Sequence, residues 1–205
     1  MLFDLDGTLL DSFQSHYRVY GHVFTDLGLP FDVQAYARYY SPNWYIFYER
    51  LRLSKDRWPE ADRLWLHYYS QEAPDRRQGA DQALAAVLAS GRALGLVTSG
   101  DRSRVERDLR RMGWTSQFRV VICGGDTADR KPKPAPLQAA LDQLQVPASR
   151  AAYVGDTVED VTMGRAAGVL TIAVLGGFSS QETLERIRPD FLVSSLSALV
   201  PLLSQ

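Results

Sequence analysis

Beyond residue 79 the chain alternates between short apolar runs and amphipathic stretches, and this alternation predicts the order of its elements. Apolar runs bounded by glycine or polar clusters predict buried strands at 93–97, 118–123, 151–154, 170–175 and 191–193. Apolar residues at helical spacing predict helices at 82–90, 103–112, 135–144, 158–167, 181–187 and 196–203. A further apolar run opens the chain and stops at Gly7. Strands that alternate with helices predict βαβ units and therefore an α/β fold with a doubly wound, Rossmann-like parallel sheet.

The segment from Phe13 to about Tyr69 has a different pattern. Aromatic and charged residues mix at helical spacing there, and 16 of the 22 aromatic residues of the chain fall within it. Its breaks, at 28–30, 41–42 and 58–59, each contain proline. We expect several helices and no strand, with most of the aromatic rings packed in a small core of their own.

The composition narrows the class of protein. With 205 residues, 45% apolar and 23% charged, the chain has the profile of one globular domain, or of one domain with an insert. A net charge of −1 gives no basic surplus, which argues against a nucleic-acid partner. One cysteine excludes a disulfide framework within the chain and a metal site of several cysteines. No long apolar run and no signal peptide are visible, so we expect no membrane span and a cytoplasmic location.

Oxygen-bearing side chains follow several of the predicted strands. In an open parallel sheet, ligands bind beyond the carboxyl ends of the strands. The sequence therefore predicts one site at that edge of the sheet. The residues are Asp4, Asp6, Thr98, Ser99, Asp126 and Asp156.

Asp4 and Asp6 stand two residues apart at the end of the first apolar run, so in a strand their carboxylates lie on the same side. Two such carboxylates near a core repel each other unless a cation or a shared proton relieves the repulsion. A strand end followed by an Asp-Gly turn explains the pair equally well. A calcium-binding EF-hand loop is excluded, because Leu9 and Ser15 stand where it needs glycine and glutamate.

Two further segments favour phosphate binding. Thr98 and Ser99 end a predicted strand and offer a hydroxyl and backbone amides, although they could equally cap the next helix. The chain has 20 arginines and only three lysines, yet two of these, Lys131 and Lys133, stand in one tripeptide. This bias indicates a need for a compact ammonium group rather than a planar guanidinium. The alternative is a solvated proline-rich loop.

Asp156 and Asp160 form the last acidic pair. They are four residues apart at the start of a predicted helix and therefore share one face. Taken alone, Asp160 could be an acidic residue favoured at a helix N-terminus by the helix dipole.

Together these segments resemble the four signatures of the haloacid dehalogenase superfamily, in the right order and strand context. The resemblance is closest to its phosphoglycolate phosphatase-like branch, in which a helical cap is inserted after the first signature. It implies a discontinuous catalytic core at 1–12 and 79–205, with an all-helical cap at 13–78. The matching residues are Asp4, Asp6, Gly7 and Thr8; Thr98; Lys131; and Gly155, Asp156 and Asp160.

The resemblance implies a phosphatase acting on a small phosphorylated metabolite. Asp4 would attack phosphorus and form an aspartyl-phosphate that water then hydrolyses. Asp6 would protonate the leaving oxygen and later activate the water. Thr98, the amide of Ser99 and Lys131 would bind the phosphoryl oxygens. Lys133 is a second candidate for the cation.

The resemblance also implies a Mg²⁺ cofactor. The ion would be held by Asp4, the backbone carbonyl of Asp6 and Asp156, and Asp160 would complete or support the acidic site. Mg²⁺ prefers such a site, with few carboxylates, several waters and a substrate phosphate.

Other functions stay open at this stage. Asp6 argues against a dehalogenase, which needs no proton donor for an alkoxide. A sugar-phosphate mutase of the same superfamily and a non-catalytic protein that binds a phosphorylated ligand are the alternatives. Trp44, Tyr45 and Tyr48 of the cap could contact the leaving group. The arginine-rich helix 102–111 also carries acidic residues, which indicates a solvated face. The sequence does not separate a monomer from a homodimer.

Overall fold

The computed structural model describes residues 1–203, and the chain divides into two compact units. The larger unit combines residues 1–11 with the chain from residue 75 onward, and the smaller unit is Ser12–Pro74. The second boundary lies four residues before the predicted one at 78/79. The reason is a short antiparallel pair, in which β3 (Asp75–Arg76) lies beside β2 (Leu10–Asp11) and so joins the larger unit.

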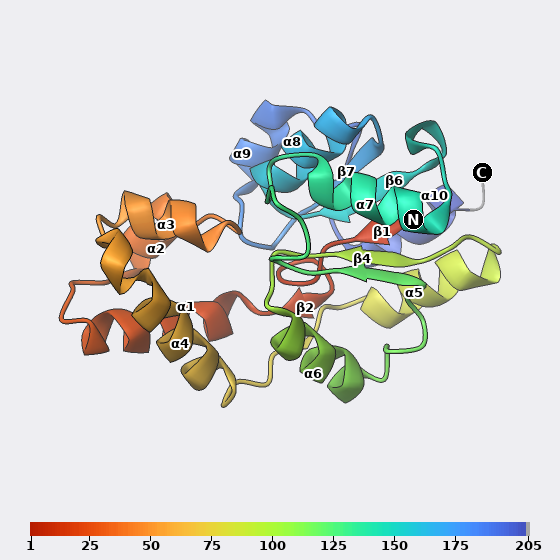
Figure 1. The fold of residues 1–205 in the computed structure, drawn as a ribbon. Helices are drawn as coiled ribbons and strands as arrows, with labels where there is room; N and C mark the ends of the chain where they lie inside the picture. Colours follow the sequence, from red (N-terminus) through yellow and green to blue (C-terminus); the bar gives the residue numbers. More distant parts are fainter. Residues whose placement is uncertain (204–205) are drawn as a thin grey trace. The chain divides into compact units, whose positions relative to one another are not determined.

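The larger unit is built on a six-stranded parallel sheet (Figure 1). Its order is β5-β4-β1-β6-β7-β8, so the first strand is central and the chain winds outward from it in both directions. This confirms the predicted doubly wound fold, whose ligand site is expected where the winding direction changes, beside β1. The strands are β1 (Leu2–Phe3), β4 (Gly95–Val97), β5 (Val120–Ile122), β6 (Ala152–Gly155), β7 (Leu170–Val174) and β8 (Phe191–Val193).

Helices connect these strands, as the apolar spacing predicted. They are α5 (Ala80–Ala89), α6 (Arg102–Met112), α7 (Ala135–Leu144), α8 (Val158–Ala167) and α9 (Gln181–Ile187), with a short 3₁₀ turn η2 (Ala148–Arg150) before β6. The predicted helix 196–203 is instead a 3₁₀ turn, η3 (Leu196–Leu199), followed by a single turn, α10 (Val200–Leu203). Pro201 explains the break, because it has no N–H for a continuous helix but fits the first turn of a new one.

The sheet buries both of its faces, because successive strand residues point to opposite sides. Leu2, Val97 and Tyr153 belong to one apolar cluster, which includes residues of α7 and α8. Phe3, Leu96 and Val154 belong to a second cluster, which includes residues of α5 and α6. Figure 1 shows these helix pairs on opposite faces of the sheet. A strand enclosed in this way leaves only its ends open to a ligand.

The smaller unit consists of helices, as its pattern predicted. The elements are α1 (Phe13–Asp26), α2 (Val33–Tyr39), α3 (Trp44–Arg50), the 3₁₀ turn η1 (Lys55–Arg57) and α4 (Trp58–Tyr69). Its core is a network of aromatic contacts, such as the edge-to-face pair of Tyr20 and Phe47, whose ring centroids lie 4.8 Å apart. Most of the aromatic excess therefore serves packing within this unit. Across residues 1–203, no helix is long and apolar enough to cross a membrane.

Candidate active site

The candidate site lies at the carboxyl ends of the three central strands. Asp4 follows β1 directly, Thr98 follows β4, and Asp156 follows β6. Because β1 pairs with both β4 and β6, these three strand ends are neighbours. The fold thus brings together residues that are more than 150 positions apart in the sequence.

Lys131 lies in the middle of the acidic cluster and is only 2% exposed. Its ammonium group is 2.8 Å from Asp4 Oδ1 and 2.8 Å from Asp160 Oδ1. Burial lowers the pKa of Lys131, but the charges of Asp160 and Asp4 outweigh this, so its pKa is raised and it stays charged. Lys133 is exposed. Of the two candidate lysines, the structure therefore places Lys131 among the carboxylates.

Asp160 has both carboxylate oxygens committed to hydrogen bonds. Oδ1 accepts from Lys131 (2.8 Å) and from the Tyr153 hydroxyl (3.2 Å). Oδ2 accepts from the Thr157 hydroxyl (2.6 Å) and from the amides of Thr157 (3.0 Å) and Asp156 (3.2 Å). Thr157 and Asp160 form a capping box that starts α8. Asp160 therefore orients its neighbours in addition to adding negative charge.

Asp156 is held by two hydrogen bonds and enclosed by two glycines. The Thr8 hydroxyl donates to its Oδ1 (2.7 Å) and the Phe178 amide to its Oδ2 (2.7 Å). A Cβ atom at Gly7 or Gly177 would lie 2.3 Å or 2.1 Å from Asp156 Oδ2. Only glycine permits this approach, so the two loops form a cradle around the carboxylate.

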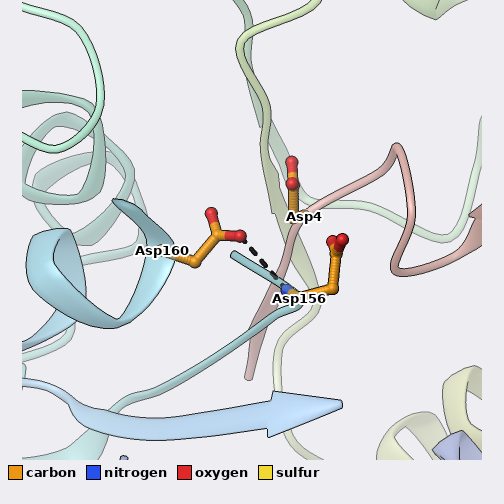
Figure 2. A group of neighbouring side chains, drawn as sticks. All are labelled: Asp4, Asp156 and Asp160. Atoms are coloured by element: carbon orange, nitrogen blue, oxygen red, sulfur yellow. Dashed lines mark hydrogen bonds between the residues drawn. The ribbon is translucent and has the colours of Figure 1, made fainter. Parts of the chain in front are cut away.

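The cluster has the chemistry of a cation site. Carboxylate oxygens of Asp4, Asp156 and Asp160 lie within 4.8 Å of one another, and all three residues are buried (Figure 2). Burial raises the pKa of Asp4 to about 7, and Asp160 adds to this against the opposing charge of Lys131. Burial, Asp160 and Asp4 raise the pKa of Asp156 well above its usual range. One ammonium group leaves negative charge in excess, which a hard divalent cation with oxygen ligands would balance.

Asp6 faces a partner that the sequence analysis missed. Arg104 of α6 donates from Nη1 to Asp6 Oδ1 (3.0 Å) and from Nη2 to Asp6 Oδ2 (2.6 Å). Arg104 and Asp108, one helical turn apart, are both buried. The expectation of a solvated face for helix 102–111 therefore does not extend to Arg104 and Asp108. Apolar Val105 and Leu109 stand beside these two residues, and this spacing marks the buried face that should have revealed them.

Thr98 and Ser99 lie at the turn between β4 and α6. The Thr98 hydroxyl accepts from the Gly100 amide (3.2 Å), and Thr98 is buried. The Ser99 hydroxyl oxygen is buried, and no described residue supplies it with a hydrogen-bond partner. The cap of α6 is Asp101, whose carboxylate accepts from the amides of Ser103 and Arg104. The helix-cap alternative for Thr98 and Ser99 is therefore wrong.

Other candidates have structural partners outside the cluster. The Asp126 carboxylate accepts from Arg102 and from the Cys123 amide (2.8 Å). Within the helical unit, the hydroxyls of Tyr45 (3.2 Å) and Tyr48 (3.1 Å) donate to Asp62. Through these contacts, Asp126 stabilises the larger unit and the two tyrosines stabilise the helical unit.

Comparison with known proteins gives consistent matches over the whole chain. The sequence model of a family described as haloacid dehalogenase-like hydrolase matches residues 1–174. A phosphoglycolate phosphatase of Yersinia pestis is 30% identical over 209 residues, covering 97% of this chain and 90% of that protein. The pyrophosphatase PpaX of Bacillus mycoides is 28% identical over 210 residues, covering 100% and 96%. The crystal structure of a hydrolase from Pseudomonas syringae shares the fold, with a TM-score of 0.90, 18% identity and coverage of 99% and 96%.

Proposed function

The chain belongs to the haloacid dehalogenase-like hydrolase family, as its motifs indicated, and we propose that it hydrolyses a small phosphorylated metabolite through a phosphate ester of Asp4. The observation that carries this proposal is the ion pair of Asp4 with Lys131 at 2.8 Å, buried beside Asp156 and Asp160. Relatives named phosphoglycolate phosphatase and pyrophosphatase support a phosphorylated substrate.

In the first step, a carboxylate oxygen of Asp4 forms a bond to phosphorus. The bond from phosphorus to the leaving oxygen breaks, and this oxygen takes the bond's electron pair and a proton from the carboxyl group of Asp6. In the second step, water attacks phosphorus and gives a proton to the Asp6 carboxylate. The bond from phosphorus to Asp4 then breaks, which releases phosphate and restores both residues.

Lys131 supplies a fixed positive charge beside the nucleophile. Held by Asp4 and Asp160, it needs no rearrangement to offset the charge that develops on the phosphoryl oxygens. The Thr98 hydroxyl and the Ser99 amide would bind the same oxygens from the end of β4. The Lys131 ammonium group is buried, so the surrounding dielectric is low and its attraction to the phosphoryl oxygens is stronger than it would be in water.

The residues present fit a Mg²⁺ ion. Asp4, Asp156 and the backbone carbonyl of Asp6 would hold it, while Asp160 keeps the amide of Asp156 and the ammonium of Lys131 in place. When bound, the ion would neutralise phosphoryl charge and orient the substrate. The cytoplasmic location stays a prediction, and both a monomer and a homodimer fit the proposal.

Phosphate release tests the proposal. We expect turnover of p-nitrophenyl phosphate and of one or more alkyl phosphates in a panel of phosphorylated metabolites, with Mg²⁺ required and EDTA inhibiting. Asp4→Asn removes the nucleophile and should abolish release. Isomerised sugar phosphate without release would favour a mutase, and metal binding without turnover would favour a binding protein. Either result would overturn the proposal.

A further inference from the structure

Arg104 is a buried charge that the proposed steps leave unused. It is 5% exposed, and it reaches the general acid and base from the first turn of α6, 98 residues away in the sequence. Arginine at such a depth is rare unless its charge is compensated, because removing it from water is costly. Packing alone therefore does not explain why a charged side chain lies at this position.

The contact with Asp6 is bidentate. Two guanidinium nitrogens of Arg104 donate to the two carboxylate oxygens of Asp6, at 3.0 Å and 2.6 Å. Such a fork-to-fork pair fixes the plane of the carboxyl group as well as its position. A lysine, with a point charge, would fix only its distance.

The surroundings of Arg104 hold its side chain in one place. Behind it, Asp108 is fully buried and lies 3.5 Å from Nη1 of Arg104. In front, a Cβ atom at Gly100 would lie 2.0 Å from Nη2 of Arg104 and 2.7 Å from its Cζ. Gly100 has no need of a left-handed backbone, so the close approach of Arg104 accounts for the glycine. Helix, glycine and aspartate together determine where the guanidinium lies.

We propose that Arg104 is a positioning residue, which fixes the Asp6 carboxyl group in the orientation needed for proton transfer to the leaving oxygen. This inference rests on the proposed function, in which Asp6 exchanges that proton. In this role Arg104 acts through Asp6 and not directly on phosphorus or the leaving group. Its loss should therefore matter in proportion to how much the leaving oxygen needs a proton.

Two substrates separate this role from a structural one. p-Nitrophenolate leaves readily without a proton, whereas an alkoxide does not. The alkyl phosphate in this test is whichever of 2-phosphoglycolate, glycerol phosphate and glucose 6-phosphate the wild-type protein hydrolyses fastest. We expect Arg104→Gln to lower kcat for this substrate about 100-fold, the scale of general acid catalysis, with KM unchanged. For p-nitrophenyl phosphate we expect the burst of p-nitrophenol, which reports the first step alone, to change by less than about threefold, which also shows that the variant is folded.

Arg104→Gln leaves Asp6 and Asp108 buried without their shared cation, so two milder variants accompany it. Arg104→Lys keeps the charge but not the fork, and should give an intermediate, still selective, loss. Gly100→Ala keeps the arginine but displaces its guanidinium, and should slow the alkyl substrate selectively as well. Arg107→Gln is the matched control, because Arg107 lies on the same helix and also pairs with Asp108, at 3.1 Å.

Each result has one meaning. Selective loss on the alkyl phosphate in Arg104→Gln, or in both milder variants if it does not fold, supports the inference. An equal loss in the first step with both substrates, no loss, or a higher kcat overturns it, as does the same selectivity in Arg107→Gln. A wild-type protein that releases phosphate from neither substrate would instead overturn the proposed function.

Discussion

The two units of this protein differ in the kind of side chain that they bury. Among the described residues, every buried aspartate, lysine and arginine lies in the larger unit. The helical unit has a core of aromatic rings instead, including Tyr36 and Phe47, both fully buried. Buried charges are poor sources of stability, whereas buried rings are good ones. The comparison assigns chemistry to the sheet edge of the larger unit and packing to the core of the smaller one.

The largest expected effect comes from removing the central charge of the larger unit. Lys131→Met should lower kcat about 10³-fold, because it removes the fixed cation beside the nucleophile. It also leaves Asp4 and Asp160 buried without compensation, which should cost about 3–5 kcal/mol of unfolding free energy. Steady-state kinetics and denaturant unfolding measure the two effects. Lys133→Met is the control, since Lys133 is exposed, and an equal loss there would contradict the assignment.

A matched disruption of the helical unit should separate stability from chemistry. Phe47→Ala removes a fully buried ring and should cost about 3–5 kcal/mol in unfolding free energy. The kcat for p-nitrophenyl phosphate should stay within the same order of magnitude, because no residue of the proposed chemistry lies in that unit. Unfolding curves and kinetics on the folded fraction provide the measurement. A loss of kcat as large as that of Lys131→Met would break the comparison.

Within the site, an uncharged neighbour should have a smaller effect. Thr8→Val keeps the shape of the side chain but removes the 2.7 Å hydrogen bond to Asp156. Loss of such a supporting contact should weaken Mg²⁺ binding about 10-fold, a typical cost for a residue that orients a ligand. Calorimetric titration of the protein with Mg²⁺ measures this. Thr162→Val, which removes a hydroxyl that donates to the Val158 carbonyl of its own helix (2.8 Å), should bind Mg²⁺ normally.

The last expected effect concerns pH. The pKa of Asp4 rises from 3.8 to about 7 on folding without metal, because the carboxylate is buried. Between these values the folded state holds a proton that the unfolded state has lost, so Asp4 lowers stability increasingly as pH rises from about 4 to about 7. Mg²⁺ should offset this loss. Melting temperatures should therefore show greater stabilisation by Mg²⁺ at pH 8 than at pH 5, and Asp4→Asn should reduce the difference.

The fold was predictable because its signals are local. Alternating strands and helices, each followed by a glycine or a polar turn, gave the parallel sheet correctly. The structure differs from the pattern where tertiary contacts decide, as at the boundary near Asp75, where Asp75 pairs with Asp11. Pro201 is a visible signal for a helix break, but the apolar residues on both sides of it fitted a single helix over 196–203.

The site was predictable in part. The family resemblance grouped Asp4, Asp156 and Asp160, and the structure brings their oxygens together. The family resemblance favoured Lys131 over Lys133, and the burial of Lys131 in the structure agrees with that choice. Arg104 was missed because a helix with many arginines suggests exposure to solvent. Nothing in the sequence identifies Asp6 as the carboxylate that compensates the charge of a buried arginine in this helix.

Direct detection of the covalent intermediate tests the central claim. We would quench turnover of p-nitrophenyl phosphate with acid and analyse the peptide Met1–Arg18 by mass spectrometry. Asp6→Asn should increase the trapped fraction, since it removes the base that activates water. The account predicts one phosphoryl group on Asp4 in this variant and in the wild type, and none in Asp4→Asn. Turnover by Asp4→Asn, or a phosphoryl group on another residue, would contradict it.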